Sequence, residues 1–263
     1  MKIDQEESDK LKLNKVLNNG AEIIGSVSGT LLGFLLAGFP GAIVGAASSP
    51  PITNTLKRLG TEISDQIMAP REKERISATY VKAVELIKGK LESGDFPRSD
   101  EFFKSKEDDR SSAETILEGI LQKAKNEHEE KKLIYYSYFL CNITFDIAIN
   151  FEQSVTYLKI IDRLSYQQLC LISHLGDQKR LDFKDWGIFF NKNSESDKFL
   201  DFYYELVELF EMKIFKQFDG AKLGGPKNGE LSLIGCNLYN LMELSNIPNT
   251  DKNLIINSNF APN

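Results

Sequence analysis

Residues 23–47 read IIGSVSGTLLGFLLAGFPGAIVGAA, a run of 25 residues without a charged side chain. A helix of this length, rising about 1.5 Å per residue, is long enough to cross a bilayer core of about 30 Å. Thirteen of the residues are Gly, Ala, Ser or Thr and eleven are Ile, Val, Leu or Phe, so the hydropathy is only borderline for a spanning helix. The length permits membrane insertion, and the composition alone does not decide it.

Small residues recur at every fourth position of this segment. They are Gly25, Gly29, Gly33, Ala37, Gly41 and Gly45. On a helix these positions form one stripe, and a stripe without side chains lets a second backbone approach closely. Each glycine costs roughly 1 kcal/mol relative to Ala in a water-exposed helix, so several glycines require close packing to offset the loss. The stripe resembles the glycine zippers of oligomeric membrane proteins and pore formers, which implies a homo-oligomer in a lipid bilayer.

Pro40 interrupts the segment, because proline removes a backbone donor and kinks a helix. The segment is therefore either one kinked span or a hairpin that turns near residues 38–41 and is too short for two full crossings. Lysines and an arginine flank both ends, which fits a hairpin with both ends in the cytosol at least as well as a single span. The competing interpretation is a Gly- and Ala-rich hairpin that is buried in a soluble protein or used for dimerisation.

The composition limits the remaining possibilities. Hydrophobic residues make up 41% of the 263 residues and charged residues 27%, which predicts a mainly globular chain. The net charge is −6, from 32 Lys and Arg against 38 Asp and Glu, which disfavours nucleic acid as a partner. Three cysteines and two histidines exclude a disulfide scaffold and a His-rich metal site. We therefore expect no cofactor and no bound metal.

The rest of the chain predicts a mainly α-helical protein. We expect a polar leader at 1–22, the glycine-rich segment at 23–56, a helical domain at 57–162, a second domain at 163–250 and a tail at 251–263. The consecutive prolines at 50 and 51 should stop any helix. A helix is expected after Pro70 from the apolar spacing, and Ser111 with Glu114 forms a capping box that opens another.

The stretch from 123 to 164 predicts further helix, in two pieces. The charged run EHEEKK (127–132) should be its solvated part. The following residues, LIYYSYFLCNITFDIAI (133–149), are apolar almost all round, which indicates a helix buried in a core. Because this stretch is short and contains Asp146, a core helix is favoured over a second membrane span.

The C-terminal part combines helices with a predicted β-hairpin. LSYQQLCLI (164–172) contains a capping box of Ser165 and Gln168, and SDKFLDFYYELVELFEMKIF (196–215) predicts a long helix. Strands are expected at Met212–Phe218 and Glu230–Ile234 around the turn DGAKLGGPKNG. Over about residues 163–245, these features and the later GCNLYNLMEL resemble winged-helix domains. The resemblance implies that the hairpin is the wing and that residues 196–215 form the third helix.

The winged-helix resemblance raises the question of DNA binding. In that family the third helix enters the major groove, where cationic or neutral polar residues are needed. Here the helix carries five carboxylates and two lysines: Asp197, Asp201, Glu205, Glu208, Glu211, Lys198 and Lys213. This charge should repel a duplex, although the wing contributes Lys216, Lys222 and Lys227 as possible contacts. A winged helix used for contacts with an unknown protein partner is favoured over a nucleic-acid binder.

A second resemblance covers most of residues 57–250. PREKERI (70–76), EHEEKKL (127–133), LSYQQLCL (164–171) and NLYNLMELSNIP (237–248) are similar to stretches of an uncharacterised bacterial family. The plan of a glycine-rich apolar segment before a helical domain also resembles abortive-infection proteins of the Abi-alpha type. This likeness implies a phage-defence context and a place at the bacterial cytoplasmic membrane, with the C-terminal domain in the cytosol. A wholly cytoplasmic protein is the alternative.

No catalytic pattern stands out in the sequence. Cys141, Cys170 and Cys236 are scattered singly in apolar contexts, which predicts buried thiols in a reducing compartment. His174 should lie near a helix C-terminus, where its charged form would be favoured. The leading hypothesis is a non-enzymatic membrane-associated protein. Its alternatives are a soluble winged-helix adaptor or transcription regulator and, with less support, an enzyme whose site is unrecognised.

Overall fold

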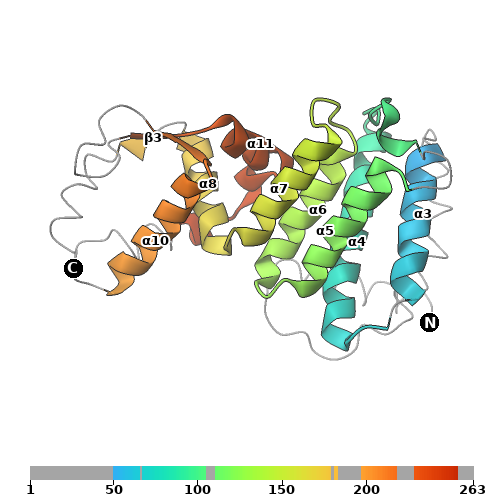
Figure 1. Cartoon of the computed structure of the whole chain (residues 1–263), viewed down its shortest axis with the longest axis horizontal. Helices are drawn as coiled ribbons and strands as arrows, with labels where there is room; N and C mark the ends of the chain where they lie inside the picture. The colour runs from blue at the N-terminus through green and yellow to red at the C-terminus, as the bar shows by residue number, and fades with distance from the viewer. Residues whose placement is uncertain are drawn as a thin grey trace. The chain divides into compact units, whose positions relative to one another are not determined.

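The computed structural model describes residues 50–65, 67–104, 110–178, 181–182, 197–217 and 228–253. The protein is mainly helical with a small antiparallel sheet, as the sequence predicts. It divides into two compact units, Met1–Asp162 and Arg163–Asn263, and Figure 1 shows their elements. The polar leader, the glycine-rich residues 23–47 and the end of the tail lie outside the described residues.

The described part of unit 1 is a bundle of five helices. They are α3 (Pro50–Asp65), α4 (Pro70–Glu92), α5 (Ser112–Asn126), α6 (Leu133–Ile143) and α7 (Phe151–Arg163), whose last residue belongs to unit 2. Two 3₁₀ turns, η1 (Glu101–Phe103) and η2 (Glu130–Lys132), lie in the connections. Figure 1 shows that successive helices run in alternating directions. The starts of α3, α5 and α7 therefore share one end of the bundle with the ends of α4 and α6.

The core of unit 1 lies between α4, α5 and α6. Ile76 and Ile87 of α4, Ile120 of α5 and Phe139 and Leu140 of α6 are all completely buried. The predicted apolar spacing of α4 is confirmed, because the buried side chains recur along one face of the helix. Burying a large aliphatic or aromatic side chain contributes about 1.5–3 kcal/mol, so these contacts dominate the stability of the unit.

Three predictions about unit 1 are wrong. Pro50 and Pro51 begin the helix α3 where the sequence predicted a break, because the first turn of a helix does not use the missing N–H. The run at 127–132 is not simply solvated, since Glu130 and Lys132 are buried. The helix expected at 133–149 ends at Ile143, and Asp146 accepts a hydrogen bond from the Ala148 N–H in the loop that follows.

The described part of unit 2 combines three helices with a small sheet. Its elements are α8 (Tyr166–Gln178), β1 (Leu181–Asp182), α10 (Asp197–Glu211), β2 (Phe215–Gln217), β3 (Asn228–Leu231), α11 (Leu233–Leu241) and η3 (Leu244–Asn246). The strands are antiparallel in the order β1-β3-β2, with Lys216 opposite Glu230. The third strand, β1, was not expected from the sequence.

Both strands of the hairpin are shorter than predicted. Lys213 adopts a left-handed backbone conformation with φ of 60° and separates α10 from β2. At the other end, the Ser232 hydroxyl accepts a hydrogen bond from the Gly235 N–H and caps α11, so β3 stops at Leu231.

No helix in the described part of the chain is both long and apolar enough to span a bilayer.

Candidate functional site

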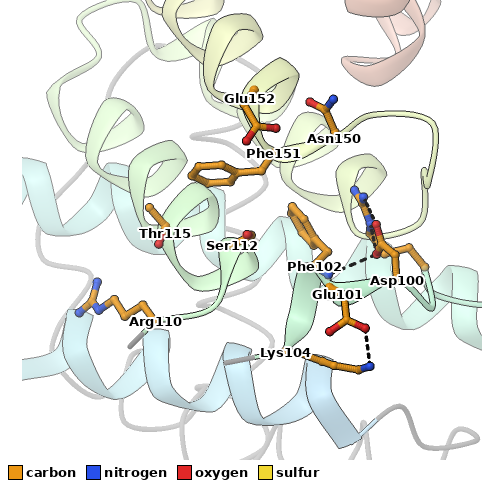
Figure 2. Close-up of a pocket in the computed structure, with 11 residues that line it drawn as sticks. Asp100, Glu101, Phe102, Lys104, Arg110, Ser112, Thr115, Asn150, Phe151 and Glu152 are labelled. Atoms are coloured by element: carbon orange, nitrogen blue, oxygen red, sulfur yellow. Dashed lines mark hydrogen bonds and ion pairs between the residues drawn. The ribbon is translucent and has the colours of Figure 1, made fainter. Parts of the chain in front are cut away.

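Unit 1 contains a cavity of about 470 Å³ at the end of the bundle where α5 and α7 begin. Figure 2 shows residues from three parts of the chain around it. The lining comes from the connection at 98–104, from Arg110 and the first turn of α5, and from Asn150 with the first two residues of α7. Its described lining contains no histidine or cysteine, and its only hydroxyl groups belong to Ser112 and Thr115.

The charges around this cavity are largely paired within the protein. Lys104 lies 2.5 Å from Glu101, and Arg110 forms ion pairs with Glu118 and, at 3.0 Å, with Glu62. These pairs leave little net charge to select a charged ligand.

Arg98 is the most buried charged group of the cavity wall. Its guanidinium donates to the carbonyl oxygens of Ile143 at 3.3 Å and Ile149 at 2.8 Å. It also donates to the Asp100 carboxylate at 2.8 Å and lies 4.0 Å from the ring of Phe102. The hydrogen bond from Arg98 lowers the pKa of Asp100 below its usual value. Because its contacts hold the connection after α4 to the loop after α6, Arg98 has a positioning role.

Helix α3 is held to the bundle by apolar and polar contacts. Its buried residues include Ile52, Leu56 and Leu59. The Tyr80 hydroxyl of α4 donates to the Leu56 carbonyl at 2.7 Å. Arg58 lies 3.1 Å from Glu114 of α5. These contacts matter because α3 directly follows the glycine-rich segment in the chain.

The same Glu114 carboxylate caps α5. It accepts a hydrogen bond from the Ser111 N–H at 2.9 Å, and the Ser111 hydroxyl accepts one from the Glu114 N–H at 3.1 Å. The predicted capping box is therefore confirmed. Its glutamate serves two purposes, because it also binds Arg58 of α3.

A second polar cluster joins two stretches that the sequence singled out. Arg71 and Arg75, from 70–76, contact the buried Glu130, from 127–133, at 2.6 and 3.3 Å. The other carboxylate oxygen of Glu130, Oε2, is buried without a hydrogen-bond partner. A buried carboxylate costs free energy unless nearby groups compensate its charge. Here the two arginines supply that compensation.

A neighbouring buried pair extends the cluster. Lys132 lies 2.5 Å from Glu127, and the Tyr136 hydroxyl donates to Glu127 at 3.3 Å. Burial, followed by the nearby carboxylates, raises the pKa of Tyr136 well above its usual value. The tyrosine therefore stays protonated and serves as a donor to the carboxylate.

In unit 2, carboxylates of α10 point toward the start of α8. Glu205 accepts a hydrogen bond from the Ser165 hydroxyl at 3.0 Å, and Glu208 accepts one from the Gln168 side chain at 3.0 Å. Arg163 also lies 3.3 Å from Glu208. Ser165 and Gln168 form the predicted capping box. Part of the negative charge of α10 therefore stabilises helix packing within the unit.

The end of the described chain closes onto α8 through Asp177. This carboxylate accepts hydrogen bonds from Lys252 and Tyr239, both at 2.6 Å. Burial tends to raise the pKa of Asp177, but the two donors outweigh it and the pKa lies below its usual value. Burial and Asp177 together raise the pKa of Tyr239 to about 12.

His174 lies close to this network. Burial, assisted by Lys252 and opposed by Asp177, lowers the pKa of His174. The expectation that the charged imidazolium is favoured at this position is therefore wrong.

The structure describes only part of the predicted site. All six residues of the stripe, together with Pro40, lie outside the described residues, as do Lys222 and Lys227. Lys216 lies on β2 and is exposed. Cys141 and Cys170 are buried as expected, whereas Cys236 on α11 is exposed. Among the described residues, no group of three or more His, Cys, Asp or Glu side chains could hold a metal ion.

The cavity and Arg98 were missed from the sequence. An isolated arginine in a polar connection gives no signal of burial, and its partners lie 45 and 51 residues further along the chain. The capping serine at 111 was the one local clue to this end of the bundle.

No family model, no curated protein and no solved structure matches the chain.

Proposed function

We propose that this chain is a non-enzymatic membrane-associated protein whose glycine-striped segment, residues 23–47, inserts into a bilayer and self-associates. The observation that carries the proposal is the charge-free run of 25 residues with a small residue at every fourth position. Close backbone packing would offset the cost of its glycines, and lipid would cover its aliphatic side chains.

The position of α3 supports a direct coupling between this segment and unit 1. The helix begins at Pro50, and only Ser48 and Ser49 separate it from the segment. Because α3 is held to α4 and α5 by Tyr80 and Glu114, a movement of the segment would be transmitted to the bundle through this helix.

Unit 2 supports a winged-helix-like domain as the second part of the proposal. Its described elements follow in the order α8, β1, α10, β2 and β3, and the sheet order is β1-β3-β2. A helix that precedes a hairpin, with a further strand pairing on the hairpin, is compatible with the wing that the sequence resemblance implies. The wing would then lie between Gln217 and Asn228.

A protein partner for this unit is favoured over DNA. The exposed Glu211 of α10 would repel phosphates, and Glu205 and Glu208 of the same helix accept hydrogen bonds from the start of α8. Tyr204 on the same helix is 68% exposed, and exposed aromatic residues are typical of protein interfaces. The resemblance to abortive-infection proteins favours a phage-defence effector at the bacterial cytoplasmic membrane, with unit 2 in the cytosol.

Membrane fractionation tests the first half of the proposal. The full-length chain should pellet with membranes and resist extraction by high salt and carbonate. A variant that begins at Ser48 should stay in the supernatant, and this start keeps α3 whole because the helix begins at Pro50. If circular dichroism shows both proteins folded and both remain in the supernatant without detergent, permanent insertion is refuted.

Substitutions in the stripe test self-association. Gly29→Leu with Gly33→Leu should abolish oligomers in detergent, because the added side chains separate the packed backbones. Ser26→Leu with Thr30→Leu adds leucines at the same spacing but off the stripe, and should preserve the oligomer. Oligomers retained by the glycine variant would contradict the zipper.

The alternative is a soluble winged-helix adaptor or transcription regulator that buries residues 23–47 in a hairpin. It predicts a full-length chain that stays in solution without detergent. A regulator would also show salt-dependent retention on DNA through Lys216, Lys222 and Lys227, and the retention should fall when these lysines are replaced.

A further inference from the structure

Two large apolar side chains are exposed on neighbouring loops of unit 1. Phe96, after α4, is 88% exposed, and Ile147, between α6 and α7, is 61% exposed. Ala148 beside Ile147 is also exposed, and Pro97 and Phe145 are partly exposed. We call these five residues the loop surface. Together they form an apolar patch of the kind that lipid or protein can cover.

Arg98 fixes the two loops relative to each other. Its backbone N–H donates to the Thr144 carbonyl at 3.1 Å, and its guanidinium donates to the Ile149 carbonyl at 2.8 Å. Phe96 precedes this arginine by two residues, and Ile147 lies between its two partners in sequence. The exposed side chains therefore lie on two loops that hydrogen bonds hold together.

The loop surface lies at the end of the bundle where α3 begins. α4 and α6 end there, α3 starts there, and α3 contacts η1, which follows Arg98 closely in the chain (Figure 1). The link from Ala47 to Pro50 spans at most roughly 10 Å even when fully extended. Insertion of residues 23–47 would therefore hold this end of unit 1 near the bilayer surface.

The charges beside the loop surface have both signs. Lys90 lies 5.3 Å from the ring centre of Phe145, whereas Asp95 and Asp146 flank the exposed residues in the sequence. Such a balance gives little attraction to anionic headgroups, so contact with lipid would depend on apolar burial.

We propose that the loop surface of unit 1 contacts the lipid bilayer, with Phe96 and Ile147 entering the region between headgroups and hydrocarbon. This inference rests on the proposed function, because the inserted segment supplies the tether. It adds a defined orientation: the end of the bundle that carries α3's first turn faces the membrane, and the opposite end, with the α3–α4 connection, faces away.

Site-specific labelling of the full-length protein tests this orientation. Cys236→Ser removes the exposed thiol of the described chain, and Cys141 and Cys170 are buried. Phe96→Cys or Ile147→Cys then receives an environment-sensitive fluorophore. The Cys236→Ser protein without an introduced cysteine measures the background labelling. Ile67→Cys is the matched control, since Ile67 is a fully exposed apolar residue in the α3–α4 connection at the opposite end. The proteins are reconstituted in phosphatidylcholine vesicles.

The expected result is a blue shift at positions 96 and 147 and quenching by a lipid-attached quencher. The fluorophore at position 67 should remain exposed to water and be quenched by iodide instead. If the protein floats with the vesicles but positions 96 and 147 behave like position 67, the loop surface is not a membrane contact, while membrane association stands. A blue shift without quenching from the lipid would also overturn the proposal, because protein would cover the surface.

A protein that does not float with vesicles at all would refute the proposed function and this inference together. Circular dichroism of each labelled variant shows whether the fold is retained. As a second measurement, Phe96→Ser with Ile147→Ser in the full chain should increase iodide access at a probe on the neighbouring Ala148→Cys. Unchanged access in that variant would argue against apolar insertion of the two side chains.

Discussion

The replacement of Arg98 by Met tests how the two loops of unit 1 are held. The Arg98 side chain is only 2% exposed, and Met preserves most of its apolar length while removing every donor. The change leaves the carbonyl oxygens of Ile143 and Ile149 without this donor. It also breaks the pair with Asp100, whose side chain is 33% exposed.

The expected loss can be worked out from these contacts. A buried carbonyl that loses its hydrogen bond costs about 1–2 kcal/mol. The pair with Asp100 is partly screened by water and contributes about 1 kcal/mol or less. The contact with the Phe102 ring adds about 0.5–1 kcal/mol. We therefore expect Arg98→Met to lower the free energy of unfolding of unit 1 by about 4 kcal/mol, or roughly a thousandfold in its unfolding equilibrium constant.

Hydrogen exchange of the full-length protein measures this loss separately for each unit. Amides in α4 and α6 of unit 1 should exchange far faster in Arg98→Met, whereas amides of α8 in unit 2 should not change. Asp100→Asn is the matched control, because it keeps the guanidinium on both carbonyls and should cost only about 1 kcal/mol. Exchange in Arg98→Met within threefold of the parent would refute the assigned role.

Two further predictions concern unit 2, and a third concerns unit 1. Since the pKa of His174 is lowered from 6.5 in the folded state, the unfolded state binds more protons below pH 6.5, and stability should fall as pH decreases through this range. His174→Gln should remove that slope in urea pulse proteolysis, and His128→Gln, at an exposed residue, tests whether the effect is specific. Gly235→Ala should destabilise the unit by about 2 kcal/mol, because the added carbon would lie 2.3 Å from the Ile214 carbonyl oxygen. Gly89→Ala should stabilise unit 1 by up to about 1 kcal/mol in thermal unfolding, because beyond its own stretch of helix no atom would lie within 4 Å of the added Cβ.

The local features of the fold could be predicted from the sequence because their causes are local. Ser111 with Glu114 and Ser165 with Gln168 form capping boxes, whose partners are three residues apart and need no knowledge of the tertiary structure. The buried face of α4 follows from the spacing of its apolar residues. The hairpin of unit 2 was found from its Gly-rich turn, although Lys213 shortens it.

The features that escaped prediction depend on distant partners. Glu130 is buried because Arg71 and Arg75 reach it from another helix, and a charge-rich sequence gives no sign of that pairing. Arg98 is buried for the same reason. The start of α3 at Pro50 was missed for a different reason: consecutive prolines can open a helix as well as end one, and only the apolar face at Ile52 distinguishes the two cases.

The contacts of α3 suggest why a membrane segment would be followed by this particular bundle. Arg110 pairs with Glu62 of α3 and with Glu118 of α5, and Glu114 binds Arg58 while it caps α5. These polar contacts join α3 to α5 and, through Arg110, to the cavity wall, while the Tyr80 hydroxyl joins α3 to α4. Exposed ion pairs contribute little individually, so α3 is held mainly by its buried Ile52, Leu56 and Leu59. Under the proposed function, a pull on residues 23–47 would reach the cavity wall through α3, because Glu62 of this helix pairs with Arg110, which lines the cavity.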